Sequence, residues 1–268
     1  MIKLLKIEWL KLKNYTTFKV ITILFLLSVF GINYIGYSIN NNITGRAKIF
    51  LGGYFSFPNV WHTVSWLSTF ALFLPGVLVI LLVTNEYTYK THRQNIIDGW
   101  SRNQFINVKI MMVLILSLAA TLWVFINALL IGFVSGGPFS IDKIEYVGFF
   151  FINCTSVLMM ALLISVLIKR AALAIAIFIA YVYILENVLG GIMNYMSIMA
   201  HDSKIGYTPI GDVLPINSTD ALLPFPFFRG MISSAINSLN EYLLLGLAAT
   251  YLFLYVYFSK RRFSRSDL

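Results

Sequence analysis

The chain has 268 residues, of which 59% are hydrophobic and only 12% are charged, and its mean hydropathy is +0.80. Soluble domains carry roughly 25% charged residues, so the composition excludes a soluble protein and indicates an integral membrane protein. The net charge of +9 does not indicate a nucleic-acid partner, because the basic residues flank apolar runs instead of clustering on a polar domain. The single cysteine, Cys154, excludes an intrachain disulfide.

The first 17 residues have the pattern of an amphipathic helix lying in the inner headgroup region of a membrane. An apolar helical stripe has lysines beside it. The stripe consists of Ile2, Leu5, Trp9 and Leu12, and the lysines are Lys3, Lys6 and Lys13. Ile7 and Leu10 lie off the stripe, so a frayed basic tail is the alternative interpretation.

Six apolar runs follow, each long enough to cross about 30 Å of hydrocarbon at about 1.5 Å per helical residue. They are residues 18–39, 61–84, 110–134, 146–168, 171–192 and 242–259. The first run lacks a small-residue cleavage motif, so we expect an uncleaved span and not a signal peptide. The predicted fold class is an all-α polytopic membrane protein with six transmembrane helices in one domain.

The basic residues predict how these spans are oriented. The two terminal segments, residues 85–109 and the turn at 169–170 carry 15 of the 20 Lys and Arg residues, and the opposite side carries the other five. By the positive-inside rule, both termini and the 85–109 segment face the cytoplasm.

The 85–109 segment contains two Ser/Thr-x-x-Gln capping boxes, each of which marks a helix start. The boxes are Thr91 with Gln94 and Ser101 with Gln104. Gly99 is placed to end a helix in the left-handed conformation, so we expect a short helix over 92–98 and a second helix from 102 into the membrane. Ile96 and Ile97 on the short helix, with Trp100 after it, are apolar side chains outside the bilayer. A protein surface is expected to cover them; contact with headgroups or with the chain's own helix ends is the alternative.

The predicted outer segments are 40–60, 135–145 and 193–241. The last contains four of the chain's seven prolines, Pro209, Pro215, Pro224 and Pro226, together with an apolar string over 221–228. Proline spacing excludes a continuous helix, while the apolar content argues against a solvated loop. We expect either short re-entrant helices covered by protein or a loop folded over the ends of the spans.

Three features lie inside the spans. Small residues recur every four positions at Ala172, Ala176 and Ala180, which predicts a helix-packing face within the subunit or between subunits. Glu186 lies inside the fifth run and is a functional candidate, because a carboxylate in a membrane needs a cavity or a partner; a protonated or snorkelling Glu is the alternative. Pro75 and Gly76 predict a weakened or kinked second span.

Enzymatic motifs are missing from the sequence. No G-x-x-x-x-G-K-[ST] phosphate loop occurs, so ATP-driven work would need another subunit. The three histidines, His62, His92 and His201, are scattered and predict no metal site. Ser135 lies in Gly-Phe-Val-Ser-Gly, whose spacing does not fit a nucleophile elbow. We therefore expect no catalytic residues, no metal and no cofactor on this chain.

The 85–109 segment resembles the loop between the second and third spans of ABC-2 type permease subunits. The resemblance rests on Glu86-Tyr, residues 91–99, Ser101-Arg102 and Lys109, and the basic N-terminal helix, six spans and long fifth outer loop extend it over the whole chain. One departure is Lys90, where relatives often place glycine before the threonine.

The resemblance implies an ATPase-docking surface on this segment. Residues 91–99 would be a coupling helix seated in a groove of a separate ATPase. Its implied docking residues are Glu86, Thr91, Arg93, Gln94, Ile96, Ile97, Gly99, Trp100 and Arg102. Glu86 would lie at the inner end of the second span and pair with a basic residue of the N-terminal helix.

The resemblance also implies an assembly and a substrate route. Two copies of a cytoplasmic ABC ATPase, with ATP and Mg bound there, would join this chain and a second, identical or paralogous permease in the bacterial inner membrane. Phe70, Phe73 and Glu186 of the second and fifth spans would line the route between subunits. Residues 205–230 would form an outer re-entrant element.

An ion-coupled secondary transporter, a polytopic membrane enzyme and a non-transporting sensor or scaffold are the alternatives. The first would need repeats and several buried ionisable groups, and the second a convergent catalytic set. The abundance of Phe and Tyr favours a lipid, a hydrophobic peptide or an amphipathic drug as substrate. Export is implied by the resemblance alone.

Overall fold

The computed structural model describes residues 2–42, 53–91, 94, 97, 99–200, 208–227 and 239–265. Every element in these ranges is helical. The helices are α1 (Ile2–Lys13), α2 (Thr16–Asn42), α4 (Val60–Thr69), α5 (Phe73–Thr88), α7 (Arg102–Val134), α8 (Glu145–Ile168), α9 (Ala171–Ile179), the π-helix η1 (Ala180–Leu185), α10 (Glu186–Ala200), the 3-10 helix η2 (Ile210–Val213), α11 (Asn217–Asp220) and α13 (Glu241–Arg265).

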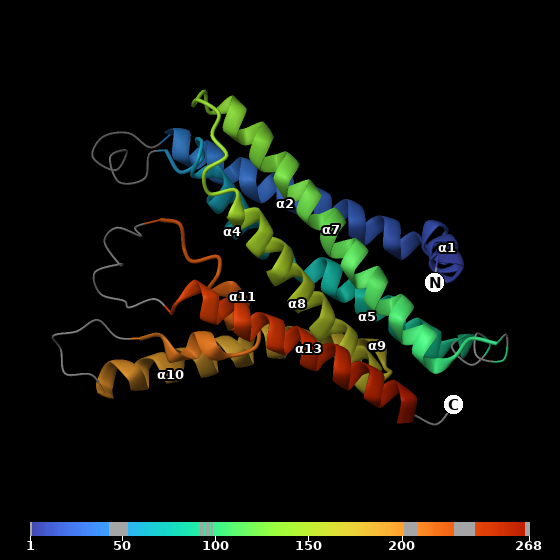
Figure 1. Ribbon diagram of the computed structural model, residues 1–268. Helices are drawn as coiled ribbons and strands as arrows, with labels where there is room; N and C mark the ends of the chain where they lie inside the picture. The colour runs from blue at the N-terminus through green and yellow to red at the C-terminus, as the bar shows by residue number, and fades with distance from the viewer. Residues whose placement is uncertain are drawn as a thin grey trace.

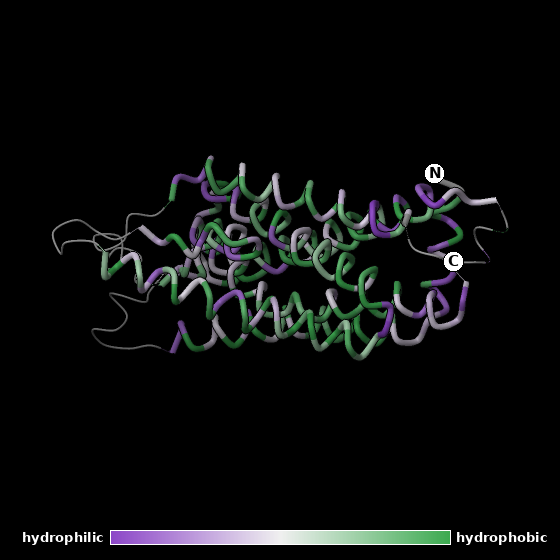
Figure 2. Tube along the Cα trace, turned by 90° about the horizontal axis from the view of Figure 1, so that it is seen from below, coloured by the Kyte–Doolittle hydropathy of each residue, from purple (hydrophilic) through white to green (hydrophobic). Residues whose placement is uncertain are grey.

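Five helices are long and apolar enough to cross a membrane, and a bent pair makes up to six candidate spans. The five are Thr16–Asn42, Arg102–Val134, Glu145–Ile168, Ala171–Ala200 and Glu241–Ser264. Figure 2 shows mostly hydrophobic residues along the middle of the long helices and hydrophilic residues mainly toward their ends. An all-helical polytopic membrane protein is therefore confirmed.

The bent pair is α4 and α5, which meet at 46° across a three-residue break where the sequence predicted one run over 61–84. Pro75 lies in the first turn of α5, where a missing N–H costs no intrahelical bond. Gly76 then allows close packing, because an added Cβ would lie 2.4 Å from the Phe178 ring. Pro75 and Gly76 predicted an interruption of the second span, but the break in the helix lies one turn earlier, at 70–72.

Other boundaries also differ from the predicted runs. The fifth span continues to Ala200 through the π-helical turn η1, so it extends eight residues beyond 192. Helix α5 reaches Thr88 and α7 begins at Arg102, which shortens the connection predicted over 85–109. Polar residues continue both helices past the apolar runs, because a helix end is set by capping and packing as well as by hydropathy.

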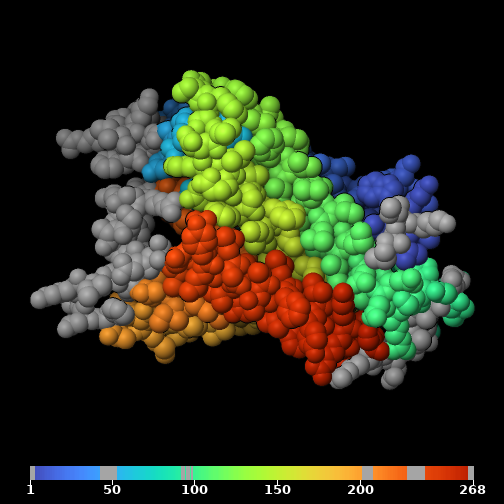
Figure 3. All heavy atoms as spheres, in the orientation of Figure 1, coloured from blue at the N-terminus to red at the C-terminus, as the bar shows by residue number. Residues whose placement is uncertain are grey.

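Helix α8 forms the centre of the bundle. In its most apolar window 72% of the residues are buried, against 17% for α2 and 22% for the span Ala171–Ala200. It packs against α4, α5, α7, α9, α11 and α13, and Figure 3 shows α13 lying along α8 and reaching the start of α7. The poorly buried faces of α2 and of the fifth span are left for lipid or another chain.

Helix α1, the start of α7 and the last turns of α13 lie at the same end of the bundle (Figure 1). Arg102 Nη1 donates a hydrogen bond of 2.6 Å to the Ser264 carbonyl oxygen, and the rings of Phe105 and Phe263 stack at 4.7 Å. We call this the N-terminal end. The segment 208–227, with η2 and α11, lies toward the opposite end, beside α10 and α13 (Figure 1).

Candidate functional site

Four charged side chains meet at the N-terminal end and join three helices. Lys109 of α7 donates hydrogen bonds to Glu8 Oε2 of α1 at 2.5 Å and to Glu86 Oε1 of α5 at 2.7 Å. Lys11 of α1 donates to Glu8 Oε1 at 2.8 Å and to Glu86 Oε1 at 3.4 Å. We call these four residues the charge cluster. Two carboxylates and two ammonium groups balance each other within it.

Three of the four side chains in the charge cluster, those of Glu8, Glu86 and Lys109, are buried. The side chains of Lys109 and Glu8 are each only 3% exposed. Burial alone would raise the pKa of Glu8, but the charge of Lys109 and hydrogen bonds from Lys109 and Lys11 hold this pKa below its ordinary value. A buried charge without its partner is strongly destabilising, so the cluster fixes α1, α5 and α7 relative to one another.

The structure shows the pairing that the resemblance implied for Glu86, with Lys11 as the basic residue of the N-terminal helix. Glu8 and Lys109 were missed as site residues. Glu8 is the only acidic residue of α1, and it lies on the same face as Leu12, which packs against Val108. The interfacial-helix interpretation placed Trp9 on the stripe that faces the headgroups, and Trp9 is exposed on the protein surface while the face carrying Glu8 turns toward α7.

The connection between α5 and α7 is described in part, and Arg93 and Ile96 lie outside the described residues. The capping box at Ser101 is formed: the Gln104 N–H donates to Ser101 Oγ at 3.1 Å, and the Ser101 N–H donates to Gln104 Oε1 at 2.9 Å. Gly99 is left-handed, with φ +95°. This box and this glycine set the exact start of α7.

The beginning of the connection differs from the predicted box at Thr91. Thr91 is itself helical, and the backbone N–H of Gln94 donates to the Lys90 carbonyl oxygen at 3.5 Å. Lys90 has a φ of +57°, a left-handed conformation that favours glycine. The chain therefore makes its turn at the position where the sequence departs from the family pattern.

The apolar residues of the connection have different surroundings. Ile97 is 83% exposed. Trp100 is half-buried and packs against both the main hydrophobic core and the small cluster that contains Leu12 and Val108. Arg102 is bonded to the Ser264 carbonyl within the chain. Of the described docking candidates, Ile97 is thus the large apolar side chain that is free for another protein.

The three residues expected on the substrate route have different surroundings. Phe70 and Phe73 are exposed, at the break and at the start of α5. Glu186 is buried, and its Oε1 accepts hydrogen bonds from the backbone N–H groups of Ile216 and, at 2.9 Å, of Asn217. Glu186 fastens the start of α11 to the fifth span, because backbone N–H groups at a helix start satisfy a carboxylate.

The predicted packing face, residues Ala172, Ala176 and Ala180, is not used inside this subunit at its first two positions. Ala172 and Ala176 are exposed, and Ala180 is half-buried. Phe178 and Ala174 are the buried residues of α9, so the helix turns a different face to α5 and α8.

Short helices covered by protein form residues 208–227 of the proline-rich segment, whose residues 201–207 and 228–238 lie outside the described residues. The Tyr251 hydroxyl donates to the Val213 carbonyl oxygen at 2.8 Å, and the Gly211 N–H donates to Asn194 Oδ1 at 2.7 Å. A Cβ on Gly211 would lie 2.4 Å from the Gly190 carbonyl oxygen, so this glycine permits the close approach to α10.

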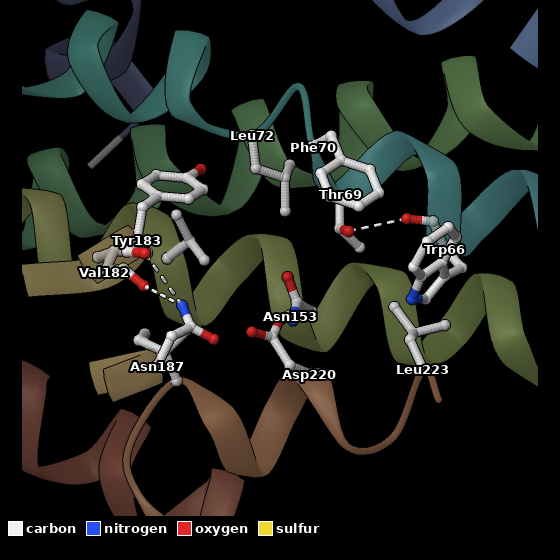
Figure 4. Close-up of a pocket in the computed structure, with 12 residues that line it drawn as sticks. Trp66, Thr69, Phe70, Leu72, Asn153, Val182, Tyr183, Asn187, Asp220 and Leu223 are labelled. Atoms are coloured by element: carbon white, nitrogen blue, oxygen red, sulfur yellow. Dashed lines mark hydrogen bonds between the residues drawn. The ribbon is translucent and has the colours of Figure 1, made fainter. Parts of the chain in front are cut away.

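A cavity of about 210 Å³ lies where the break in the second span faces the π-helical turn of the fifth, with α8 and α11 forming the other walls (Figure 4). Its lining residues are Trp66, Thr69, Phe70, Leu72, Asn153, Val157, Val182, Tyr183, Asn187, Ile216, Asp220 and Leu223. We call it the α8 cavity. π-Helical turns are often found at functional sites, and the cavity depends on two helix irregularities that hydropathy alone does not reveal.

In comparisons with known proteins, the family model described as ABC-2 family transporter protein matches residues 4–187. No curated protein matches the chain. The matched range includes α1, the bent second span, the connection to α7 and all four residues of the charge cluster.

Proposed function

Because the chain belongs to the ABC-2 family of transporter proteins, and is thus a permease of an ABC transporter, we propose that it couples a substrate route to a separate ATPase. The family implies partnership with an ABC ATPase component. Two ATPase copies and a second permease, identical or paralogous, would complete the assembly in a bacterial inner membrane. ATP and Mg would bind on the ATPase, and the N-terminal end would face the cytoplasm.

One observation carries the coupling proposal: an exposed apolar residue lies on a connection whose flanking helices are locked together. Ile97 projects between α5 and α7, while Lys109 binds both Glu86 of α5 and Glu8 of α1. A push on the connection would therefore move three helices as one body. Such a rigid unit is what transmits nucleotide-driven motion to a distant gate.

The proposed substrate is hydrophobic or amphipathic, and the proposed direction is export. The bent second span supports a route beside it, because Phe70 at the break and Phe73 after it expose aromatic side chains. Buried ionisable groups would favour an ion-coupled carrier, but those of the charge cluster are neutralised by each other and Glu186 is held by backbone N–H groups.

The test is Ile97→Asp in the permease assembled with its ATPase. We expect the affinity of the two subunits to fall by about tenfold or more, because the apolar side chain of Ile97 loses its burial and a carboxylate must lose its water. Substrate-stimulated ATP hydrolysis would fall with it, while membrane insertion would not change. Gly99→Pro should act likewise, because Pro cannot adopt the φ of +95°.

The matched control is Ile141→Asp, which makes the same change at a residue that is 62% exposed in the α7–α8 connection. Normal complex formation and hydrolysis in the Ile97→Asp variant, or equal losses in both variants, would refute the docking assignment.

A further inference from the structure

The polar groups that line the α8 cavity present acceptors more than donors. Asn153 Nδ2 donates to Asp220 Oδ1 at 2.5 Å and to Thr219 Oγ1 at 3.4 Å. Asn187 Nδ2 donates to the carbonyl oxygens of Val182 and Tyr183 at 3.2 and 3.3 Å. Both amide groups therefore point their N–H donors at protein, and the side-chain oxygen of Asn187 is turned toward Asp220 (Figure 4).

Asn153 is the buried member of the polar wall. Its residue is only 1% exposed, and its Oδ1 has no hydrogen-bond partner. A buried polar atom without a partner carries a cost of about 1–3 kcal/mol, and native proteins leave few such atoms. Asn153 thus lies behind the cavity wall, where its Nδ2 holds Asp220, whose side chain lines the cavity.

The charge in the cavity is negative. Asp220 exposes its carboxylate to the cavity, and Figure 4 shows it beside Asn153, with the side-chain oxygen of Asn187 turned toward both. None of the twelve lining residues is basic. The pocket thus contains a carboxylate and the amide oxygen of Asn187, with no basic residue in its lining.

The remaining wall is apolar and aromatic. Trp66 and Phe70 pack edge to face at 5.0 Å, and Leu72 and Leu223 lie beside them. Aromatic rings attract organic cations through their faces. The volume of about 210 Å³ is smaller than the ~300–1,000 Å³ of pockets for drug-sized ligands, so it fits a head group and the adjoining part of a chain.

We propose that the α8 cavity binds the protonated primary amine of an amphipathic ligand, with the Asp220 carboxylate and the Asn187 amide oxygen accepting its N–H donors and Trp66 and Phe70 contacting its apolar part. The inference deepens the proposed permease function by naming a ligand class. A metal ion fits less well, because Asp220 is the only carboxylate in the lining and the described residues contain no group of three or more metal-binding side chains.

The experiment measures binding of three six-carbon probes to the purified full-length chain in nanodiscs of zwitterionic lipid. The probes are hexylammonium, hexanoate and hexanol, which share a chain and differ in charge. We expect hexylammonium to bind at least about tenfold more tightly than either other probe, since hydrogen bonds to a charged group are worth about 1.5–3 kcal/mol. This comparison needs no variant and no ATPase.

Asp220→Asn is the informative substitution, because it removes the charge and keeps an oxygen that can accept the Asn153 hydrogen bond. It should weaken hexylammonium binding by about tenfold or more. Asp212→Asn is the matched control: Asp212 lies in η2 of the same segment but does not line the cavity, and binding should be unchanged.

Equal affinity for hexylammonium and hexanoate would overturn the proposal, as would equal losses in the Asp220→Asn and Asp212→Asn variants. Displacement of hexylammonium by millimolar K⁺ would also overturn it in favour of an inorganic cation site. These outcomes are separate from those of the Ile97→Asp test, since amine binding without ATPase docking would leave the cavity assignment intact and remove the coupling proposal.

Discussion

The charge cluster and the α8 cavity surround their charged groups in opposite ways. In the cluster, each carboxylate accepts hydrogen bonds from lysine, and two negative groups meet two positive ones. In the cavity, Asp220 has the neutral amide of Asn153 as its hydrogen-bond donor, and Asn153 Oδ1 has no donor at all. A balanced cluster holds helices together, whereas an unbalanced one is prepared for a ligand.

The largest effect, on the free energy of unfolding, is expected from a substitution in the charge cluster. Lys109→Met leaves Glu8 and Glu86 buried without their main partner, which should lower the free energy of unfolding by about 3–5 kcal/mol. The measurement is the unfolding midpoint of the purified chain. Lys11→Met is the matched control, because Lys11 is 39% exposed and lies 3.4 Å from Glu86, so its loss should cost much less.

A compensated variant sharpens this test if Lys109→Met does not fold. Replacing Glu8 and Glu86 with Gln in the Lys109→Met chain removes the uncompensated charges, and stability should largely return. A Lys109→Met chain as stable as the Lys11→Met chain would show that the cluster does not fasten these helices.

A smaller effect is expected at Glu186, which belongs to neither region and links the fifth span to α11. Glu186→Leu leaves the backbone N–H groups of Ile216 and Asn217 without their acceptor, at a cost of about 1–3 kcal/mol. Hydrogen exchange of these two amides should become faster than in the native chain. Glu241→Leu, at an exposed helix start, is the control, and unchanged exchange in the Glu186→Leu chain would remove the fastening role.

The smallest expected effect is the pH dependence of hexylammonium binding. The protein around the Asp220 carboxyl group displaces water from it and raises its pKa to about 6; the Asn153 hydrogen bond opposes this rise, and the charges of Glu186 and Asp212 add to it. Tyr183 also faces this carboxyl group. Because the protonated carboxyl is neutral, binding should be full above pH 6 and weaken by up to about tenfold for each pH unit below it.

The control for this dependence is the Asp220→Asn chain, whose weaker binding should not change between pH 5 and pH 7, a range chosen to span the pKa of about 6. Native affinity that stays constant across the same range would exclude Asp220 as the titrating partner.

Local sequence rules predicted those parts of the molecule that depend on neighbouring residues. The Ser101 capping box gave the start of α7, and Gly99 gave the left-handed turn before it. The apolar runs predicted which segments form the candidate spans, because the hydrocarbon thickness sets the length that a span needs. Glu86 was identified through the resemblance of its loop.

The remaining features depend on contacts between distant residues. Glu8 and Lys109 are 101 positions apart, and each alone has the pattern of an ordinary charge at a membrane edge. Asp220 and Asn153 meet across 67 positions, and Asn153 lies in a run that hydropathy describes only as apolar. The break between α4 and α5, at 70–72, lies before Pro75, the residue that predicted it. Tertiary packing determines the position at which the helix is interrupted.

The central claim is that an ATPase subunit docks on the α5–α7 connection. Cross-linking in membranes tests it most directly. Cys154 is buried, so Ile97→Cys adds the one exposed thiol among the described residues. The account predicts a cross-link from Ile97→Cys to the ATPase subunit that changes with bound nucleotide, and none from Ile141→Cys. Transport-competent membranes in which Ile97→Cys never reaches a second polypeptide would contradict it.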